Sequence, residues 1–307
     1  MAICSHKYTS FHVFHHVIKL GSQDNNMDWL QINRQQKAKE LSAIFAEPFQ
    51  VLTITILSIL LPLSFLLLAR LSCYSYLLSI AADPAHPPSS FIFSLFLYSA
   101  PIILYFLVSF VSISTLLHGL TGRLTVLSES PGELYRSRLF TAWILLCALQ
   151  ACVGLGIEGS IAAEIDGYSF KNERSLFSRV IFFLGLHETM LYWCRTVVKP
   201  VVDDTIFGVV REERWVQMVA MAVSFGTLWW WRLRDEVESL VIVAESRREM
   251  SVDIGVADFL GWWLYYLTVT IGVVRIVKGV MWVTMVLLCR RIKRNSHQDP
   301  CGNEEKV

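Results

Sequence analysis

The sequence predicts an all-α fold, a polytopic membrane helix bundle of about six transmembrane helices with an N-terminal amphipathic helix. Hydrophobic residues make up 54% of the 307-residue chain and charged residues only 17%, whereas soluble domains carry about 25% charged residues. The apolar residues also gather in long runs without charge. About 20 helical residues cross the ~30 Å hydrocarbon core of a bilayer, so these runs favour a chain that crosses it repeatedly.

The predicted spans follow the apolar runs of the chain. They cover residues 51–69, 91–117, 139–157, 180–198, 215–232 and 256–289. Pro62 is expected to kink the first span, and Pro101 interrupts the second. Residues 71–82 are too short to cross a bilayer, so they either extend the first span or form a re-entrant segment. Residues 276–289 either protrude as part of one long helix or bend at Gly279 into the membrane interface.

The spans are flanked by segments of different character. Residues 1–27 are polar and are expected to be a disordered tail. Residues 28–47 are amphipathic and are expected to lie on the bilayer surface, or alternatively to pack on the bundle as a cytosolic helix. Residues 48–294 form the predicted bundle, and 295–307 are a polar C-terminal tail. Residues 234–249 keep helical character and are expected to extend the fifth span beyond the membrane.

Basic residues indicate the orientation of the bundle. Fourteen Lys and Arg residues flank one set of span ends, and eight flank the other set. Positive residues concentrate in the cytosolic loops of membrane proteins. The count therefore predicts that both termini lie in the cytosol.

The predicted fourth span carries ionisable residues that are costly in hydrocarbon. His187, Glu188 and Arg195 all lie within it. Glu188, Tyr192 and Arg195 are spaced i, i+4, i+7, which places them on one helix face. Such residues normally face a bundle interior or a watery cavity, so we expect protein on this side of the helix.

Further ionisable residues in or beside the spans complete a candidate intramembrane polar cluster. The cluster comprises Glu158, Glu164, His187, Glu188, Tyr192, Arg195, Asp258, Arg275 and Lys278. Its acids and bases can largely neutralise one another. They either form structural pairs that fix the register of the helices or line a path for an ion, a proton or a small solute. Arg275 or Lys278 is the expected partner of Glu188.

A second set of charges closes the last span. The basic residues Arg290, Arg291, Lys293 and Arg294 follow it directly. Basic residues beside a span attract anionic lipid by about 1 kcal/mol each. We expect this cluster to face lipid, although it could serve only to orient the helix.

Little in the sequence indicates catalysis. It contains no P-loop, no G-x-S-x-G elbow and no H-E-x-x-H motif, and no Cys-x-x-Cys pair among its seven cysteines. His187 is the single histidine within a predicted span, whereas a membrane hydrolase or transferase needs several converging groups. We expect no metal and no cofactor. With a net charge of +1 we also expect no nucleic-acid partner.

The segment Glu47–Ser72, EPFQVLTITILSILLPLSFLLLARLS, leads from an amphipathic stretch into a span with the core LPLSFLLLA. This segment, together with the six-span layout, resembles a family of uncharacterised land-plant multi-pass membrane proteins. The resemblance implies a plant source and an endomembrane (ER) or plasma-membrane setting. It brings no reaction, ligand or catalytic residue.

Together these features favour a structural or interaction component of a plant membrane over an enzyme. Its expected partners are the lipid bilayer and other membrane proteins. The alternative is a transporter or channel for an ion or small solute that uses the intramembrane charges, although the chain shows no internal repeat with matching helix breaks. The second alternative is a membrane-embedded lipid-modifying enzyme.

Overall fold

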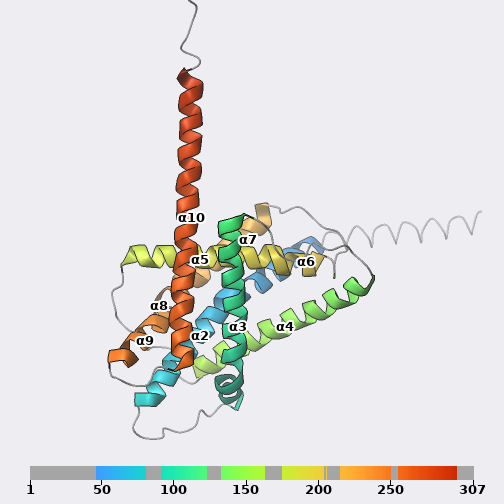
Figure 1. The fold of residues 1–307 in the computed structure, drawn as a ribbon. Helices are drawn as coiled ribbons and strands as arrows, with labels where there is room; N and C mark the ends of the chain where they lie inside the picture. Colours follow the sequence, from blue (N-terminus) through green and yellow to red (C-terminus); the bar gives the residue numbers. More distant parts are fainter. Residues whose placement is uncertain are drawn as a thin grey trace, which may run out of the picture. The chain divides into compact units, whose positions relative to one another are not determined.

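The computed structural model describes residues 46–80, 91–122, 133–162, 175–203, 205, 215–249 and 255–295. Within these ranges the chain is almost entirely helical and contains no strand (Figure 1). The predicted tail 1–27, residues 28–45 of the predicted amphipathic helix and residues 296–307 of the predicted tail 295–307 lie outside the described residues. The chain divides into two units, Met1–Leu52 and Thr53–Val307. In the first unit the described residues 46–52 are helical.

The helices follow one another along the whole second unit. They are α2 (Leu60–Ile80), α3 (Phe91–Thr121), α4 (Glu133–Ala162), α5 (Leu176–Trp193), α6 (Lys199–Val202), α7 (Trp215–Leu228), α8 (Arg234–Glu236), α9 (Ser239–Glu249) and α10 (Val256–Asn295). A π-helical turn at Cys194–Val198 joins α5 to α6, and another at Trp229–Leu233 joins α7 to α8.

Four helices in the described part of the chain are long and apolar enough to cross a membrane. They are Ala46–Ile80, Pro101–Thr121, Leu139–Ile161 and Val256–Arg291. These helices correspond to the predicted first, second, third and last spans. The chain therefore has the character of a membrane protein, but with fewer such helices than the six that the sequence predicts.

The two predicted spans outside this set are 180–198 and 215–232. The first overlaps α5, whose apolar character is reduced by Arg179, His187 and Glu188, and α5 passes into a π turn after Trp193. The second overlaps α7, which ends after 14 residues. At 1.5 Å per residue that helix is about 21 Å long and falls short of the ~30 Å hydrocarbon core.

The first span is interrupted near Pro62, where a kink was expected. Residues 53–58 are helical, Ile59 is a turn residue, and α2 begins at Leu60. Pro62 has no N–H to donate to the carbonyl of Ser58, which breaks the regular helical ladder at this point. In addition, the Ser58 hydroxyl donates to the carbonyl of Ile54 at 2.6 Å. A side-chain hydrogen bond of this kind often bends a helix.

The two segments of ambiguous character both continue a helix. α2 runs unbroken to Ile80, so residues 71–80 extend the first span. α10 runs unbroken from Val256 to Asn295 and does not end at Gly279, so the long-helix alternative holds. Pro101 likewise lies inside α3 without ending it.

α2 is the centre of the core. Leu60, Leu61, Leu66, Leu67 and Ala69 are buried, and together they cover every side of the helix. A helix that is apolar all round is stable only when it is enclosed or in lipid. Here its neighbours are α3, α4, α5, α9 and α10, which all contact it.

The segment 234–249 is largely helical, as expected, and its α9 part is enclosed by other helices. Residues Leu240–Ala244 of α9 are all buried, and α9 packs against α2 and α10. The Ser239 hydroxyl donates to the carbonyl of Ala69 on α2 at 3.2 Å. The run LVIVA covers more than a full helical turn with apolar side chains. Packing it against two helices removes this apolar surface from water, which is favourable.

α5 and α10 cross at very short range, and Figure 1 shows α5 running across α10 rather than alongside it. Two glycines make the contact possible. A Cβ added to Gly185 would overlap the carbonyl oxygen of Thr268 and lie 3.0 Å from the amide nitrogen of Gly272. A Cβ added to Gly272 would overlap the carbonyl oxygen of Ile181. Small residues allow helix backbones to approach in this way in membrane proteins.

Gly185→Ala should therefore destabilise the fold. The added methyl group has to push two backbones apart, and overpacking of this kind costs roughly 1–3 kcal/mol. Gly226→Ala on α7 is the matched control, because nothing lies within 4 Å of the position of its Cβ. Thermal unfolding in detergent should show a lowered Tm for the first variant and an unchanged or raised Tm for the second. Equal melting temperatures would contradict the close crossing.

Candidate functional site

Four arginines join different elements of the bundle through acids. Arg70 of α2 pairs with Glu236 of α8, and Arg179 of α5 pairs with Glu238 between α8 and α9. Arg247 of α9 pairs with Asp258 of α10, and Arg275 of α10 pairs with Glu188 of α5. These pairs connect segments far apart in sequence, and they form the main polar feature of the described bundle.

Arg70 is the most deeply placed of these bases. Its Nε and Nη2 donate to the two carboxylate oxygens of Glu236 at 2.5 and 2.8 Å, and its Nη1 donates to the Ser160 hydroxyl of α4 at 2.8 Å. The guanidinium fork matches a carboxylate in this two-bond geometry. These hydrogen bonds connect α2, α4 and α8. In the sequence, Arg70 only marks the end of the predicted first span.

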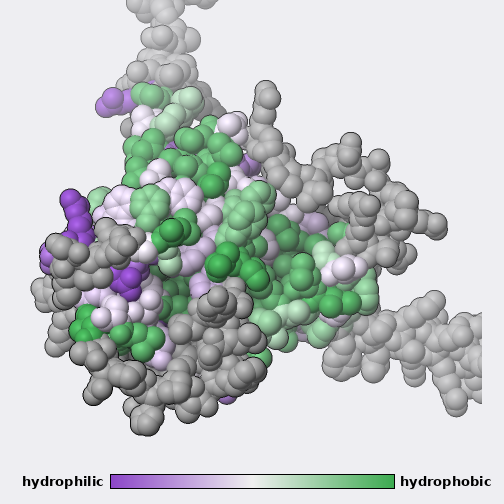
Figure 2. All heavy atoms as spheres, turned by 60° about the horizontal axis from the view of Figure 1, so that its bottom comes forward, coloured by the Kyte–Doolittle hydropathy of each residue, from purple (hydrophilic) through white to green (hydrophobic). Residues whose placement is uncertain are grey.

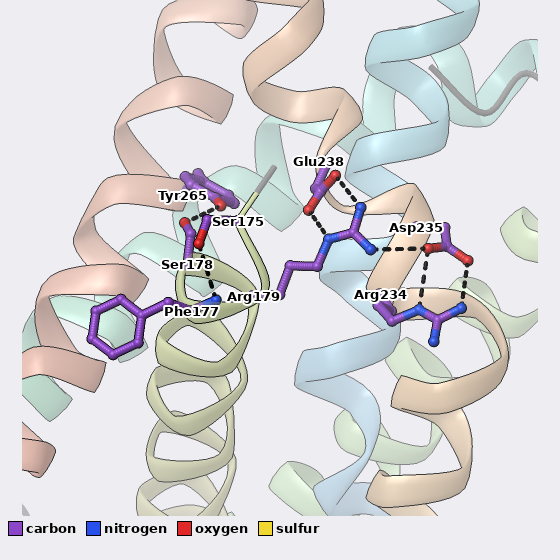
Figure 3. A network of polar contacts seen from close by, with 8 residues as sticks. All are labelled: Ser175, Phe177, Ser178, Arg179, Arg234, Asp235, Glu238 and Tyr265. Atoms are coloured by element: carbon purple, nitrogen blue, oxygen red, sulfur yellow. Dashed lines mark hydrogen bonds and ion pairs between the residues drawn. The ribbon is translucent and has the colours of Figure 1, made fainter. Parts of the chain in front are cut away.

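Arg179 makes a second two-bond contact, shown in Figure 3. Its Nε and Nη2 donate to Glu238 at 2.7 and 3.0 Å, and its Nη1 lies 3.7 Å from Asp235. Beside this contact the hydroxyls of Ser178 and Tyr265 lie 3.4 Å apart, which adds a polar link from α5 to α10.

Asp258, a member of the predicted cluster, is paired with a base that the cluster did not include. Arg247 Nη1 donates to its Oδ2 at 2.7 Å, and both side chains are largely buried. Arg247 Nη2 also donates to the Ser75 hydroxyl at 3.3 Å. Arg247 is one of the eight basic residues counted on the second set of span ends, and the apolar run Leu240–Ala244 before it is the sequence signal that could have identified it.

Glu188 and Arg275 come together across α5 and α10. Arg275 is one of the two bases that the sequence indicated for Glu188, and its Nη1 forms the ion pair with Oε2. Lys278, the other base, lies one turn further along α10. Glu188, Arg275 and Lys278 all border a cavity of about 300 Å³ between α3, α5 and α10. Both members of the ion pair are partly exposed, at 32% for Glu188 and 41% for Arg275.

The remaining predicted cluster residues do not gather at one point. The Tyr192 ring lies 5.5 Å from that of His118, and the His187 ring contacts Phe183 and Phe225 at 6.2 and 5.6 Å. Arg195 is exposed beyond α5.

Glu158 is exposed on α4 and forms no ion pair within the described ranges, and Glu164 lies outside them. Of the predicted cluster, Glu188, Arg275 and Lys278 therefore meet at one cavity, and its other described members lie in separate contacts.

The basic cluster lies at the end of α10. Arg290 and Arg291 are exposed, and Lys293 and Arg294 continue the same helix. This placement keeps two of the four charges accessible on the part of α10 that is furthest from α5.

Neither a metal centre nor a nucleotide fingerprint is present in the described part of the chain. No group of three His, Cys, Asp or Glu side chains there could hold a metal ion. Gly154–Gly159 reads G-x-G-x-x-G, a spacing that binds dinucleotides when it follows a strand and opens a helix. Here it lies in the interior of α4, where helical hydrogen bonds occupy the backbone. It is therefore a set of helix glycines.

No protein-family model, curated protein or solved structure matches this chain. The resemblance of Glu47–Ser72 to a plant membrane-protein family stays a prediction.

Asp258→Asn should strongly destabilise the bundle, because it leaves Arg247 with its charge in a largely buried position. Removing one partner of a buried pair costs roughly 3–5 kcal/mol in soluble proteins. Glu158→Gln, an exposed acid on α4, is the control and should change the free energy of unfolding by less than about 0.5 kcal/mol. Denaturant unfolding in detergent measures both.

A double variant tests whether the charge itself is responsible. Replacing Arg247 and Asp258 together by Leu removes both charges and should recover part of the stability that Asp258→Asn loses. If Asp258→Asn behaves like Glu158→Gln, the pair does not stabilise the bundle.

Proposed function

We propose that this protein is a structural or interaction component of a membrane, and that it binds another membrane protein through the C-terminal half of α10. One observation carries the proposal. The consecutive residues Val280, Met281, Trp282 and Val283 are 60%, 63%, 68% and 47% exposed. Successive residues point about 100° apart, so these side chains sample the whole circumference of the helix. No described helix covers this half of α10 on any side.

The length of α10 gives this exposure its meaning. Its 40 residues make a helix about 60 Å long, roughly twice the hydrocarbon core of a bilayer. The N-terminal half packs against α3, α5 and α9, and Figure 1 shows the rest continuing beyond them. Apolar surface on all sides is stable only in lipid or against another apolar surface. The transmembrane helices of a partner supply such a surface.

The ion pairs support a structural role for the charges more than a transport path. Glu188, Asp258 and Arg275 of the predicted cluster each pair with a group on a neighbouring element. A conducting row needs groups that follow one another across the membrane and can exchange their partners. A lipid-modifying enzyme needs converging catalytic groups, and the separate placement of His187 and Glu188 offers little support for one.

The surroundings of the bundle are also consistent with lipid. Apolar side chains cover much of the coloured surface in Figure 2. Phe106 and Phe110 on α3 are examples, with 75% and 59% of their surface exposed. The membrane we propose is a plant endomembrane (ER) or plasma membrane, on the strength of the resemblance at Glu47–Ser72.

We further propose six spans with both termini in the cytosol. α5, its π turn and α6 form a continuous helical run from Leu176 to Val202, and α7 continues through its own π turn to Glu236. Each run is long enough to cross a bilayer at 1.5 Å per residue. The basic-residue count supports the orientation.

Glycosylation mapping distinguishes six spans from four. With six spans an acceptor site inserted at Gly208 lies on the cytosolic side and should stay unmodified. With the four spans that meet the length and hydropathy test, the same site lies on the opposite side and would be glycosylated. Acceptors near Ser89 and Asn172 should be modified in both cases and serve as positive controls. Modification of a C-terminal acceptor would reverse the orientation.

Site-specific photo-cross-linking tests the interaction itself. A photoreactive residue replacing Met281 should give a protein cross-link of defined mass in native membranes, because this position faces the proposed partner. The same residue replacing Phe106 is the control, since Phe106 is also largely exposed but lies on α3; it should give mainly lipid adducts. Lipid adducts alone at both positions would contradict an interaction through α10.

A further inference from the structure

The cavity between α3, α5 and α10 has the features of a binding site. Its volume of about 300 Å³ lies at the lower end of the range for small-molecule sites. Each helix contributes to the wall: Thr115 and Gly119 from α3, Glu188 from α5, and Ile271, Arg275 and Lys278 from α10. The α10 residues are spaced i, i+4 and i+7, so a single face of that helix lines the cavity.

The charges on the wall favour an anion. Two bases, Arg275 and Lys278, face one acid, Glu188, and the acid is already paired with Arg275. Among the described residues Lys278 has no ion-pair partner. It lies on a helix that otherwise meets the requirements for a membrane span. An unpaired ammonium group at such a position is costly, and an anion bound beside it offsets that cost.

The position of the cavity favours an anion at membrane depth. Thr115 and Gly119 belong to the last two turns of the candidate span Pro101–Thr121, so the cavity lies near the end of that span. The ring pair of His118 and Tyr192 adjoins the same region of α3. Amphipathic rings of this kind concentrate where lipid headgroups begin.

The rest of the wall is apolar. Leu116, Ile271 and Val274 supply it, and the Cβ position of Gly119 lies 3.7 Å from Val274 Cγ1, where α3 and α10 meet. A purely ionic site would need no such surface. A ligand with an anionic head and a hydrocarbon tail matches both parts of the wall.

We propose that this cavity binds the anionic headgroup of a membrane amphiphile, a phosphate or a carboxylate, through Lys278 and Arg275. The apolar wall contacts the first part of the hydrocarbon chain. Glu188 holds the Arg275 guanidinium in place and limits the net charge of the site to +1. This inference is independent of the interaction proposed for α10.

Native mass spectrometry of the full-length protein tests this site. The probe is dioleoyl phosphatidic acid, titrated in a neutral detergent against dioleoyl phosphatidylcholine, a zwitterionic lipid with no net charge, as the comparison. Lys278→Gln should weaken binding of phosphatidic acid about fivefold, which corresponds to the ~1 kcal/mol of one basic charge near anionic lipid. Arg248→Gln on α9 is the matched control, because Arg248 is an exposed base outside both the cavity and the basic cluster at the end of α10. An equal loss for both variants would mean general attraction to basic residues and would overturn the site.

Two further measurements complete the test. Gly119→Leu fills the cavity and leaves every charge in place, so it should also weaken binding while thermal unfolding stays near that of the parent protein. Unchanged binding in this variant would overturn the cavity as the site. Inorganic phosphate distinguishes a free anion from a lipid headgroup. If it displaces the lipid at equal concentration, the ligand is a free anion and the amphiphile is excluded.

Discussion

Pairing of arginine with carboxylates across helices is the interaction on which this bundle depends. Arg70, Arg179 and Arg247 come from three different helices, and all three meet acids between α8 and the first turn of α10. A buried charge without its partner is costly, so each pair forms only when its two elements stand in one register. Apolar packing alone would allow neighbouring helices to slide, whereas these pairs select a single arrangement.

The close crossing of α5 and α10 explains where the Glu188–Arg275 pair lies. Gly185 and Gly272 bring the two backbones into contact. Glu188 follows the first glycine by three residues and Arg275 follows the second by three, so each acidic or basic group stands about one turn past the crossing point. As the helices diverge from this point, space opens toward α3, and this space is the cavity that the two side chains border.

The two halves of α10 lie in different surroundings, because other described helices pack only against the first half. Leu264, Tyr265 and Thr268 are buried against other helices, while Met281 and Trp282 are exposed. Both halves are nevertheless apolar. The first half draws its stability from the bundle, and the second requires lipid or a partner, which is why the proposed interaction belongs to the second half.

The sequence by itself determined that the chain is helical and membrane-like, because long uncharged runs have few other stable forms. It also indicated Glu188 with Arg275 and the interruption near Pro62, since charge and the missing N–H are local properties. Only the tertiary structure decided that Arg247 belongs to Asp258, that α9 is enclosed, and that Gly185 meets Gly272. Pairings between distant segments depend on which helix faces come together in the fold. The local sequence around a basic residue beside a span is the same whether its side chain contacts water or a buried acid. Two of the predicted spans are not among the four helices long and apolar enough to cross a membrane, because Arg179, His187 and Glu188 reduce the apolar character of α5 and a π turn ends α7 after 14 residues.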